Sequence, residues 1–205
     1  MAKNLSGVML NAQRGGYLGM ANHSVFLQIA GVVAESVVDG PGLRAVVFFQ
    51  GCPHHCPGCH NPETWDPQGG EKLSLDEVWR RLRYNPLLSG VTFSGGEPLA
   101  QPEGALALAK KVRAAGGNVM IYTGYTWEEV QAFSLPAVKE LLALTALLVD
   151  GPFQLAQKKP DLLFRGSANQ RIIDVQRTLA EQKLVLWAGK EDGRDGLATT
   201  GGAGN

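Results

Sequence analysis

All three cysteines of the chain lie in one short segment, at Cys52, Cys56 and Cys59. Their spacing is C-x-x-x-C-x-x-C, and the prolines and the glycine between them are typical of a loop that wraps around a ligand. Thiolates are soft ligands that suit zinc or an iron–sulfur cluster. Three adjacent cysteines do not form a disulfide framework, so we expect a reducing, cytoplasmic setting.

Three thiolates leave either kind of metal site one ligand short. Structural zinc takes four protein ligands, and His54, His55 or His60 could supply the fourth. A histidine beside cysteines in one short loop nevertheless gives an awkward tetrahedral geometry. A cubane iron–sulfur cluster with three thiolates keeps one iron open, and an open metal position marks a site for substrate. The spacing therefore favours a cluster over zinc.

A second candidate segment, residues 91–98, reads V-T-F-S-G-G-E-P at the end of a predicted strand. Paired glycines let the backbone approach a ligand closely, and carbonyls with one carboxylate suit an ammonium group. Ser94, Gly95, Gly96 and Glu97 are the candidate binding residues. Taken alone, such a segment is more often an ordinary turn between a strand and a helix.

Together, the two segments resemble the radical S-adenosylmethionine (radical SAM) family. In that family three cysteines hold a 4Fe–4S cluster, and the amino and carboxylate groups of S-adenosylmethionine bind the fourth iron. An electron from the cluster then cleaves the sulfonium to methionine and a 5′-deoxyadenosyl radical. The resemblance implies that Cys52, Cys56 and Cys59 are the cluster ligands. Gly58 stands where many members carry an aromatic residue, a departure found in the branch that activates ribonucleotide reductase.

Five further segments are similar to that branch: residues 39–42, 59–65, 122–125, 149–153 and 165–170. They imply an enzyme that generates a glycyl radical on anaerobic ribonucleoside-triphosphate reductase, with reduced flavodoxin or ferredoxin as electron donor. Three alternatives stay open. The chain could activate another glycyl-radical enzyme, could be a small radical SAM enzyme that modifies a nucleobase or, more distantly, could be a zinc-binding interaction module.

Five residues outside these two segments are weaker candidates. Thr123 and Gly124 end a central predicted strand and could line the S-adenosylmethionine pocket. Asp150 could bind a ribose hydroxyl or a cation, or could cap a turn. Arg165 and Asn169 could bind the partner or the carboxylate of the cofactor, or could belong to a surface ion pair.

The candidate residues follow short apolar runs that alternate with helical patterns. Strands are predicted at residues 44–49, 91–94, 118–123 and 147–150, with two further runs at 170–175 and 184–187; helices are predicted at 73–82, 103–115 and from 126. This alternation predicts parallel βαβ units, whose loops gather at the carboxyl ends of the strands. The chain is too short for a closed barrel of about 250 residues. The predicted fold class is α/β, a partial (open) parallel β/α barrel of the radical SAM type.

Composition sets the remaining limits. Residues 1–22 are predicted to be a loose extension, residues 23–188 a single radical SAM domain, and residues 189–205, rich in Gly and Thr, a disordered tail. The formal net charge is zero, which gives no reason to expect nucleic-acid binding. No run of about 18 apolar residues is present, so no membrane partner is expected.

Overall fold

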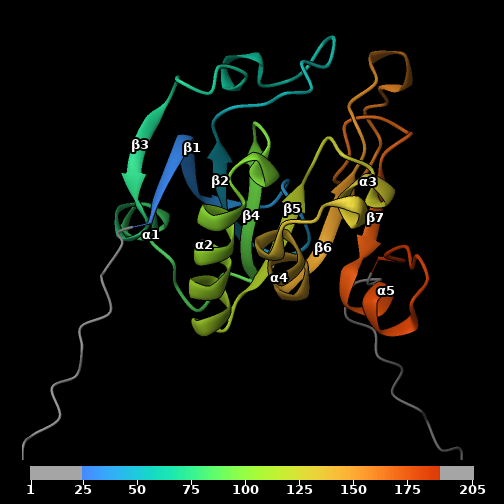
Figure 1. Ribbon diagram of the computed structural model, residues 1–205. Coiled ribbons are helices and arrows are strands. Elements are labelled where there is room, and N and C mark those ends of the chain that lie inside the picture. Colours follow the sequence, from blue (N-terminus) through green and yellow to red (C-terminus); the bar gives the residue numbers. More distant parts are fainter. Residues whose placement is uncertain (1–24, 190–205) are drawn as a thin grey trace, which may run out of the picture.

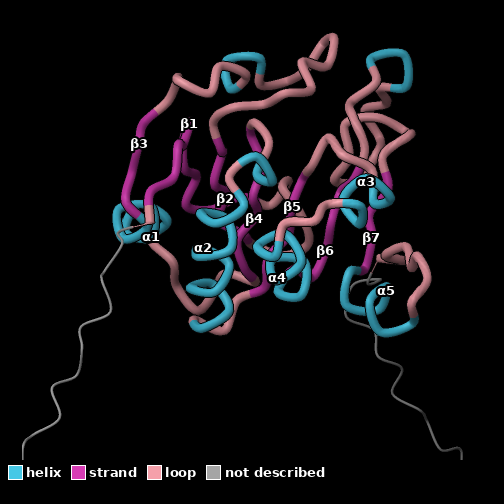
Figure 2. The backbone as a smooth tube through the Cα atoms, viewed as in Figure 1, coloured by secondary structure: helices cyan, strands magenta, loops and turns pink. Residues whose placement is uncertain are grey.

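The computed structural model describes residues 25–189, which form a seven-stranded sheet in the order β3-β1-β2-β4-β5-β6-β7. Helices lie over one face of this sheet, and long loops collect at one end of the strands (Figures 1 and 2). The predicted extension 1–22 lies outside the described residues, as does all of the predicted tail but residue 189. Within this part of the chain, no helix is both long and apolar enough to cross a membrane.

Four parallel strands form the centre of the sheet: β2 (Arg44–Phe49), β4 (Gly90–Gly95), β5 (Asn118–Tyr122) and β6 (Thr145–Asp150). They match the strands predicted from the sequence. These runs are almost wholly apolar because central parallel strands are covered on both faces.

The two edges of the sheet are antiparallel. At one edge β1 (Phe26–Ser36) pairs with both β2 and β3 (Glu71–Ser74), and at the other β7 (Arg171–Asp174) pairs with β6. An antiparallel partner needs no crossover helix, and the link from β6 to β7 holds only a short 3-10 turn, η3 (Leu155–Gln157). The predicted run 184–187 makes a single bridge, from Leu186 to Ile173. The sheet is open and α/β, as predicted, but mixed rather than wholly parallel.

Five helices connect or flank the strands: α1 (Leu75–Leu82), α2 (Pro102–Ala114), α3 (Trp127–Ala132), α4 (Pro136–Leu144) and α5 (Val175–Glu181). Helix α1 begins after Ser74, whose Oγ accepts a hydrogen bond from the Glu77 N–H at 3.2 Å. Helix α3 begins with a complete capping box between Thr126 and Glu129. Both helices were predicted, at residues 73–82 and from residue 126. Residues 73 and 74, predicted as helical, belong to β3 instead.

Alternation along the central strands separates the core from the site. Val47, Phe93 and Ile121 point to the helix-covered face, where each is fully buried. The neighbouring residues of opposite parity, including Phe48 and Ser94, point to the other face and reach a cavity at the carboxyl ends of the strands. The helices therefore cover one face. The other face is covered by a smaller apolar cluster that includes Met120 and Val149, and the cavity lies at the carboxyl ends of the strands.

Candidate cofactor site at the strand ends

A cavity of about 420 Å³ lies where the four parallel strands end. The loop after each of these strands contributes to its wall: Cys52, Cys56 and Cys59 after β2; Ser94, Gly95 and Gly96 at the end of β4; Thr123 and Gly124 after β5; Gly151 and Phe153 after β6. The structure thus brings together nine of the twelve predicted site residues, Arg165 among them. Glu97 and Asp150 lie behind the wall.

The three cysteines face this cavity as free, partly buried thiols. The Cys59 N–H donates to the Cys56 carbonyl at 3.0 Å, and the Asn61 N–H donates to Cys59 Sγ at 3.4 Å. Burial is the main cause of the raised pKa of the Cys52 thiol. The positive charge of a bound metal would have the opposite effect and lower this pKa. Three thiols on one cavity, with a backbone N–H directed at a sulfur, form a donor set that fits a cluster with one open iron.

The histidines of the cysteine loop are engaged elsewhere. His54 Nε2 contacts the Glu97 carboxylate at 2.9 Å, the His55 ring stacks on Trp65, and the His60 ring packs against Phe153. Among residues 25–189, no group of three His, Cys, Asp or Glu side chains is arranged to hold a single metal ion. Nothing in this arrangement singles out one histidine as a fourth zinc ligand.

The Glu97 side chain makes hydrogen bonds to three loops. Its fully buried carboxylate accepts hydrogen bonds from Leu99 N–H at 2.9 Å and Thr123 Oγ1 at 3.0 Å through Oε1. Its Oε2 accepts from Gly124 N–H and His54 Nε2, both at 2.9 Å. Both oxygens are occupied by protein donors, so the geometry gives Glu97 a positioning role rather than direct contact with an ammonium group.

Gly95 and Gly96 allow the second loop to lie against the strand that precedes the cysteines. Gly95 has φ +88°, and a Cβ there would lie 2.8 Å from the Phe49 backbone. A Cβ on Gly96 would lie 2.5 Å from the Gly51 carbonyl oxygen. These glycines are therefore needed for close contact with the end of β2 and the loop after it. Both also line the cavity, and their close approach to a ligand stays a prediction.

Comparison with known proteins decides the family. A family model described as "4Fe-4S single cluster domain" matches residues 38–173. The anaerobic ribonucleoside-triphosphate reductase-activating protein of Escherichia coli K12 is 36% identical over 143 residues, 65% of this chain and 90% of that protein. The chain belongs to this family of radical SAM activating proteins. The predicted enzyme class, 4Fe–4S cluster and S-adenosylmethionine are those of the family.

Two other relatives agree with this placement. The protein of the same name from Enterobacteria phage T4 is 31% identical over 144 residues, 66% of this chain and 86% of that protein. The pyruvate formate-lyase-activating enzyme of Clostridium pasteurianum is 43% identical over 112 residues, 50% of this chain and 47% of that enzyme. Among solved structures, QueE from Escherichia coli aligns over 49% of this chain and 53% of its own, at 20% identity and a TM-score of 0.39, a likeness too weak to bear on the fold.

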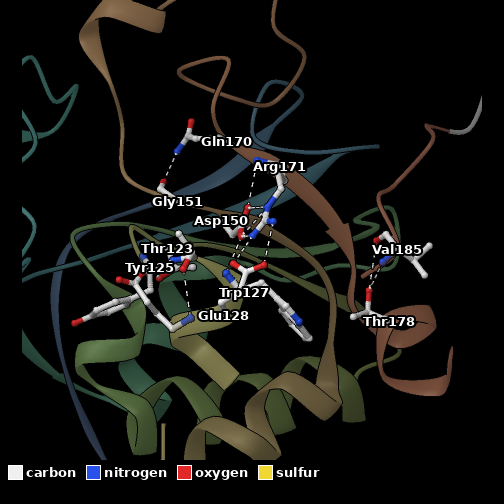
Figure 3. Close-up of polar contacts among 12 residues, drawn as sticks. Thr123, Tyr125, Trp127, Glu128, Asp150, Gly151, Gln170, Arg171, Thr178 and Val185 are labelled. Carbon is white, nitrogen blue, oxygen red and sulfur yellow. Dashed lines mark hydrogen bonds and ion pairs between the residues drawn. The ribbon is translucent and has the colours of Figure 1, made fainter. Parts of the chain in front are cut away.

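Within this activating-protein fold, Asp150 is a structural anchor (Figure 3). Its side chain is 1% exposed and accepts from the Trp127 N–H at 2.7 Å, which fixes the start of α3. It also accepts from Arg171 Nη2 at 2.5 Å and Nε at 3.1 Å, and Arg171 reaches on to Glu128 at 2.8 Å. The hydrogen bonds that Arg171 donates to Asp150, and then those that it donates to Glu128, raise the pKa of Arg171. Of the predicted alternatives, the capping role matches this arrangement.

Two residues of the activating-protein motifs have positions that the sequence did not reveal. Asn169 donates through Nδ2 to the Pro152 carbonyl at 2.8 Å, and it is not part of the cavity wall. Gln170 had no predicted role, yet it lines the cavity and donates to the Gly151 carbonyl at 3.0 Å (Figure 3). Its place at the end of the R-G-S-A-N-Q segment was the signal available in the sequence.

Proposed function

We propose that this chain generates a glycyl radical on an anaerobic ribonucleoside-triphosphate reductase, using S-adenosylmethionine bound at a 4Fe–4S cluster. One observation carries the proposal. Three cysteines face one cavity beside the Gly-Gly-Glu and Thr-Gly loops, in a chain 36% identical to a reductase-activating protein. When bound, the cluster and S-adenosylmethionine supply a 5′-deoxyadenosyl radical that can take a hydrogen atom from the Cα of a glycine.

The residues of the cavity wall would divide the work of binding. Cys52, Cys56 and Cys59 would hold the cluster, with the Asn61 N–H supporting one thiolate. The backbone of residues 94–96 offers polar groups for the amino group of S-adenosylmethionine.

Residues just after β5 would complete the pocket, and Glu97 would hold it in shape. Thr123 and Gly124 line the cavity but give their hydrogen bonds to Glu97. They would therefore shape the pocket, and the Glu97 carboxylate would keep their loop in register with the cysteine loop. Asp150 would act in the same indirect way, by holding the start of α3.

Exposed apolar side chains near the cavity favour a macromolecular substrate. Val37 and Val38 are 70% and 73% exposed, and Leu163 is 59% exposed beside two residues of the wall. Isolated apolar side chains on a surface need no explanation, but Val38 lines the cavity, and Val37 and Leu163 adjoin wall residues in the chain. A backbone glycine can reach the interior only if its loop enters such an opening.

The proposal also includes an electron donor and a cellular compartment. The electron would come from a one-electron carrier, reduced flavodoxin or ferredoxin. Both donors fit a cytoplasmic protein whose cysteines stay reduced.

The test of this function uses the purified partner. The chain is reconstituted with iron and sulfide without oxygen, then mixed with S-adenosylmethionine, dithionite and the reductase. We expect a glycyl-radical signal in the electron paramagnetic resonance (EPR) spectrum of the reductase, and none with the Cys56→Ala variant.

Pyruvate formate-lyase serves as the competing substrate because one relative activates that enzyme. A radical on pyruvate formate-lyase, and none on the reductase, would replace the proposed partner by the alternative one. Cleavage of S-adenosylmethionine with no radical on either protein would point to the nucleobase-modifying alternative.

A further inference from the structure

The segment between β6 and β7 contacts the cysteine loop outside the cavity. Gly58 has φ +74°, and a Cβ there would lie 3.0 and 3.2 Å from the two methyl carbons of Leu155. Neither of these two residues lines the cavity. Leu155 is nevertheless 55% exposed, so a partner in solution can reach a side chain that touches the residue directly before Cys59.

The turn that carries Leu155, η3, is held in a fixed shape. The Gln154 N–H donates to Ser167 Oγ at 3.1 Å, and Lys158 forms an antiparallel bridge with the same buried serine. Figure 1 shows this turn, drawn in orange after β6, at the end of the sheet where the loops collect. The surface around Leu155 is therefore formed before a partner arrives, which lowers the entropy lost on binding.

Positive charge surrounds Leu155 in the sequence. Residues 152–170 contain three cations, Lys158, Lys159 and Arg165, and one carboxylate, that of Asp161. Lys158 and Lys159 are exposed, and neither forms an ion pair within residues 25–189. Exposed charge of one sign attracts partners of the opposite sign and speeds their association. An apolar contact beside two lysines therefore fits an acidic protein.

The other flank of the cysteine loop has the opposite charge. A second cavity, of about 470 Å³, adjoins the loop there and is lined in part by Trp65 and Gln50. The Gln50 amide donates to the carbonyls of Glu63 and Asp66 at 3.1 and 2.7 Å. Residues 61–70 contain these two carboxylates and neither Lys nor Arg. An acidic partner is therefore repelled on this flank and attracted to η3.

We infer that Leu155, Lys158 and Lys159 form the docking surface for an acidic one-electron carrier. This rests on the proposed function, in which S-adenosylmethionine and the substrate glycine fill the cavity, so that the electron enters from outside it. Electron tunnelling slows steeply with distance, and a carrier on Leu155 would be separated from Cys59 by one glycine. The carrier loses one electron and the cluster gains it; no bond forms or breaks.

The test measures binding and electron transfer separately. The probe is a bacterial flavodoxin, an acidic carrier, and its Kd for the cluster-loaded protein is measured by anaerobic calorimetry at low and at high salt, without S-adenosylmethionine. Reduction of the cluster is then followed by stopped-flow absorbance. The electron comes either from reduced flavodoxin or from the methyl viologen radical cation, which carries the opposite charge.

Four variants separate charge from apolar contact. Lys158→Glu and Lys159→Glu each reverse one charge, and Leu155→Ala shortens the apolar side chain. Lys139→Glu is the matched control, because Lys139 is exposed and without an ion pair in the described residues but lies on α4. Bound iron is measured in each variant, and if Leu155→Ala loses its cluster the two lysine variants decide the outcome.

We expect each of the two charge reversals at η3 to raise the Kd for flavodoxin about 3- to 30-fold at low salt, because an attraction between exposed charges becomes a repulsion of similar size. Screening should reduce this difference at high salt. Leu155→Ala should raise the Kd about 2- to 10-fold at both salt concentrations. Lys139→Glu should change it less than about twofold. Reduction by methyl viologen should not slow in any variant.

Three results would overturn the inference. Wild-type affinity and wild-type reduction rates with flavodoxin in all the η3 variants would exclude this surface. Weaker binding of the reductase to these variants, with unchanged flavodoxin binding, would assign the surface to the protein substrate. Wild-type protein that binds neither flavodoxin nor ferredoxin would show that no such carrier docks. A missing glycyl radical with dithionite would instead refute the proposed function, because dithionite needs no docking surface.

Discussion

The substitution Glu97→Gln tests whether this carboxylate binds S-adenosylmethionine or has the positioning role that its hydrogen bonds indicate. An amide in place of the carboxylate turns one of the two acceptor oxygens into a donor. If the nitrogen replaces Oε2, the hydrogen bond from the Gly124 N–H is lost, and the contact with His54 survives only if the ring takes the tautomer in which Nε2 accepts. If it replaces Oε1, the bond from the Leu99 N–H is lost.

The cost follows from one or two lost hydrogen bonds at a fully buried site. A hydrogen bond to a charged group contributes about 1.5–3 kcal/mol, so the free energy of unfolding should fall by roughly 2–5 kcal/mol. For a domain of this size, that corresponds to a melting temperature lower by roughly 5–15 °C. A ligand role predicts no such loss in the absence of S-adenosylmethionine.

The assay is urea unfolding followed by tryptophan fluorescence, with the cluster-loaded protein and without added S-adenosylmethionine. Glu35→Gln is the control, since Glu35 is exposed and its side chain makes no ion pair or hydrogen bond in the described part of the chain. The positioning role requires a clear loss of unfolding free energy for Glu97→Gln and none for the control. Wild-type stability together with weak S-adenosylmethionine binding would refute it.

Three other substitutions extend the test. Cys56→Ala should lose the cluster and all cleavage of S-adenosylmethionine, measured as bound iron and as methionine formed; retained cleavage would refute the ligand assignment. Gly124→Ala places a Cβ 2.3 Å from the His54 ring and should lower stability by about 1–3 kcal/mol, whereas Gly31→Ala meets nothing within 4 Å and should be neutral in the same urea assay. Asp150→Asn should lower the urea midpoint by the equivalent of about 1–3 kcal/mol, because it weakens the ion pair with the partly exposed Arg171 and the hydrogen bond at the start of α3. An unchanged midpoint would mean that neither contact stabilises the fold.

The central strands could be predicted because their burial on both faces leaves continuous apolar runs. β1 could not, because its register shifts twice and only Leu27 and Ile29 are buried within it. β3 is four residues long and directly precedes a helix, so its pattern merges with the helical one. The direction of β7 depends on the absence of a crossover helix after β6, which a strand pattern does not encode.

The site shows the same division between local and distant information. The cysteine loop and the glycine loop are each one continuous segment that follows a predicted strand. Their residue types and their places after parallel strands were sufficient to predict that they share one end of the sheet. The contacts of Glu97 were not predictable, since His54 and Thr123 lie 43 and 26 residues away in the chain. Asp150 likewise meets an arginine 21 residues away. Residue type suggested a ligand for Glu97 and left a ligand or a cap open for Asp150, and only the folded chain reveals the donors that occupy these carboxylates.

The most direct test of the account is the EPR spectrum of the reduced, reconstituted protein with and without S-adenosylmethionine. The account predicts a reduced 4Fe–4S signal that shifts when S-adenosylmethionine is added, because the molecule binds the iron that Cys52, Cys56 and Cys59 leave open. A colourless protein that takes up zinc and no iron would contradict it, and so would a cluster signal that S-adenosylmethionine leaves unchanged.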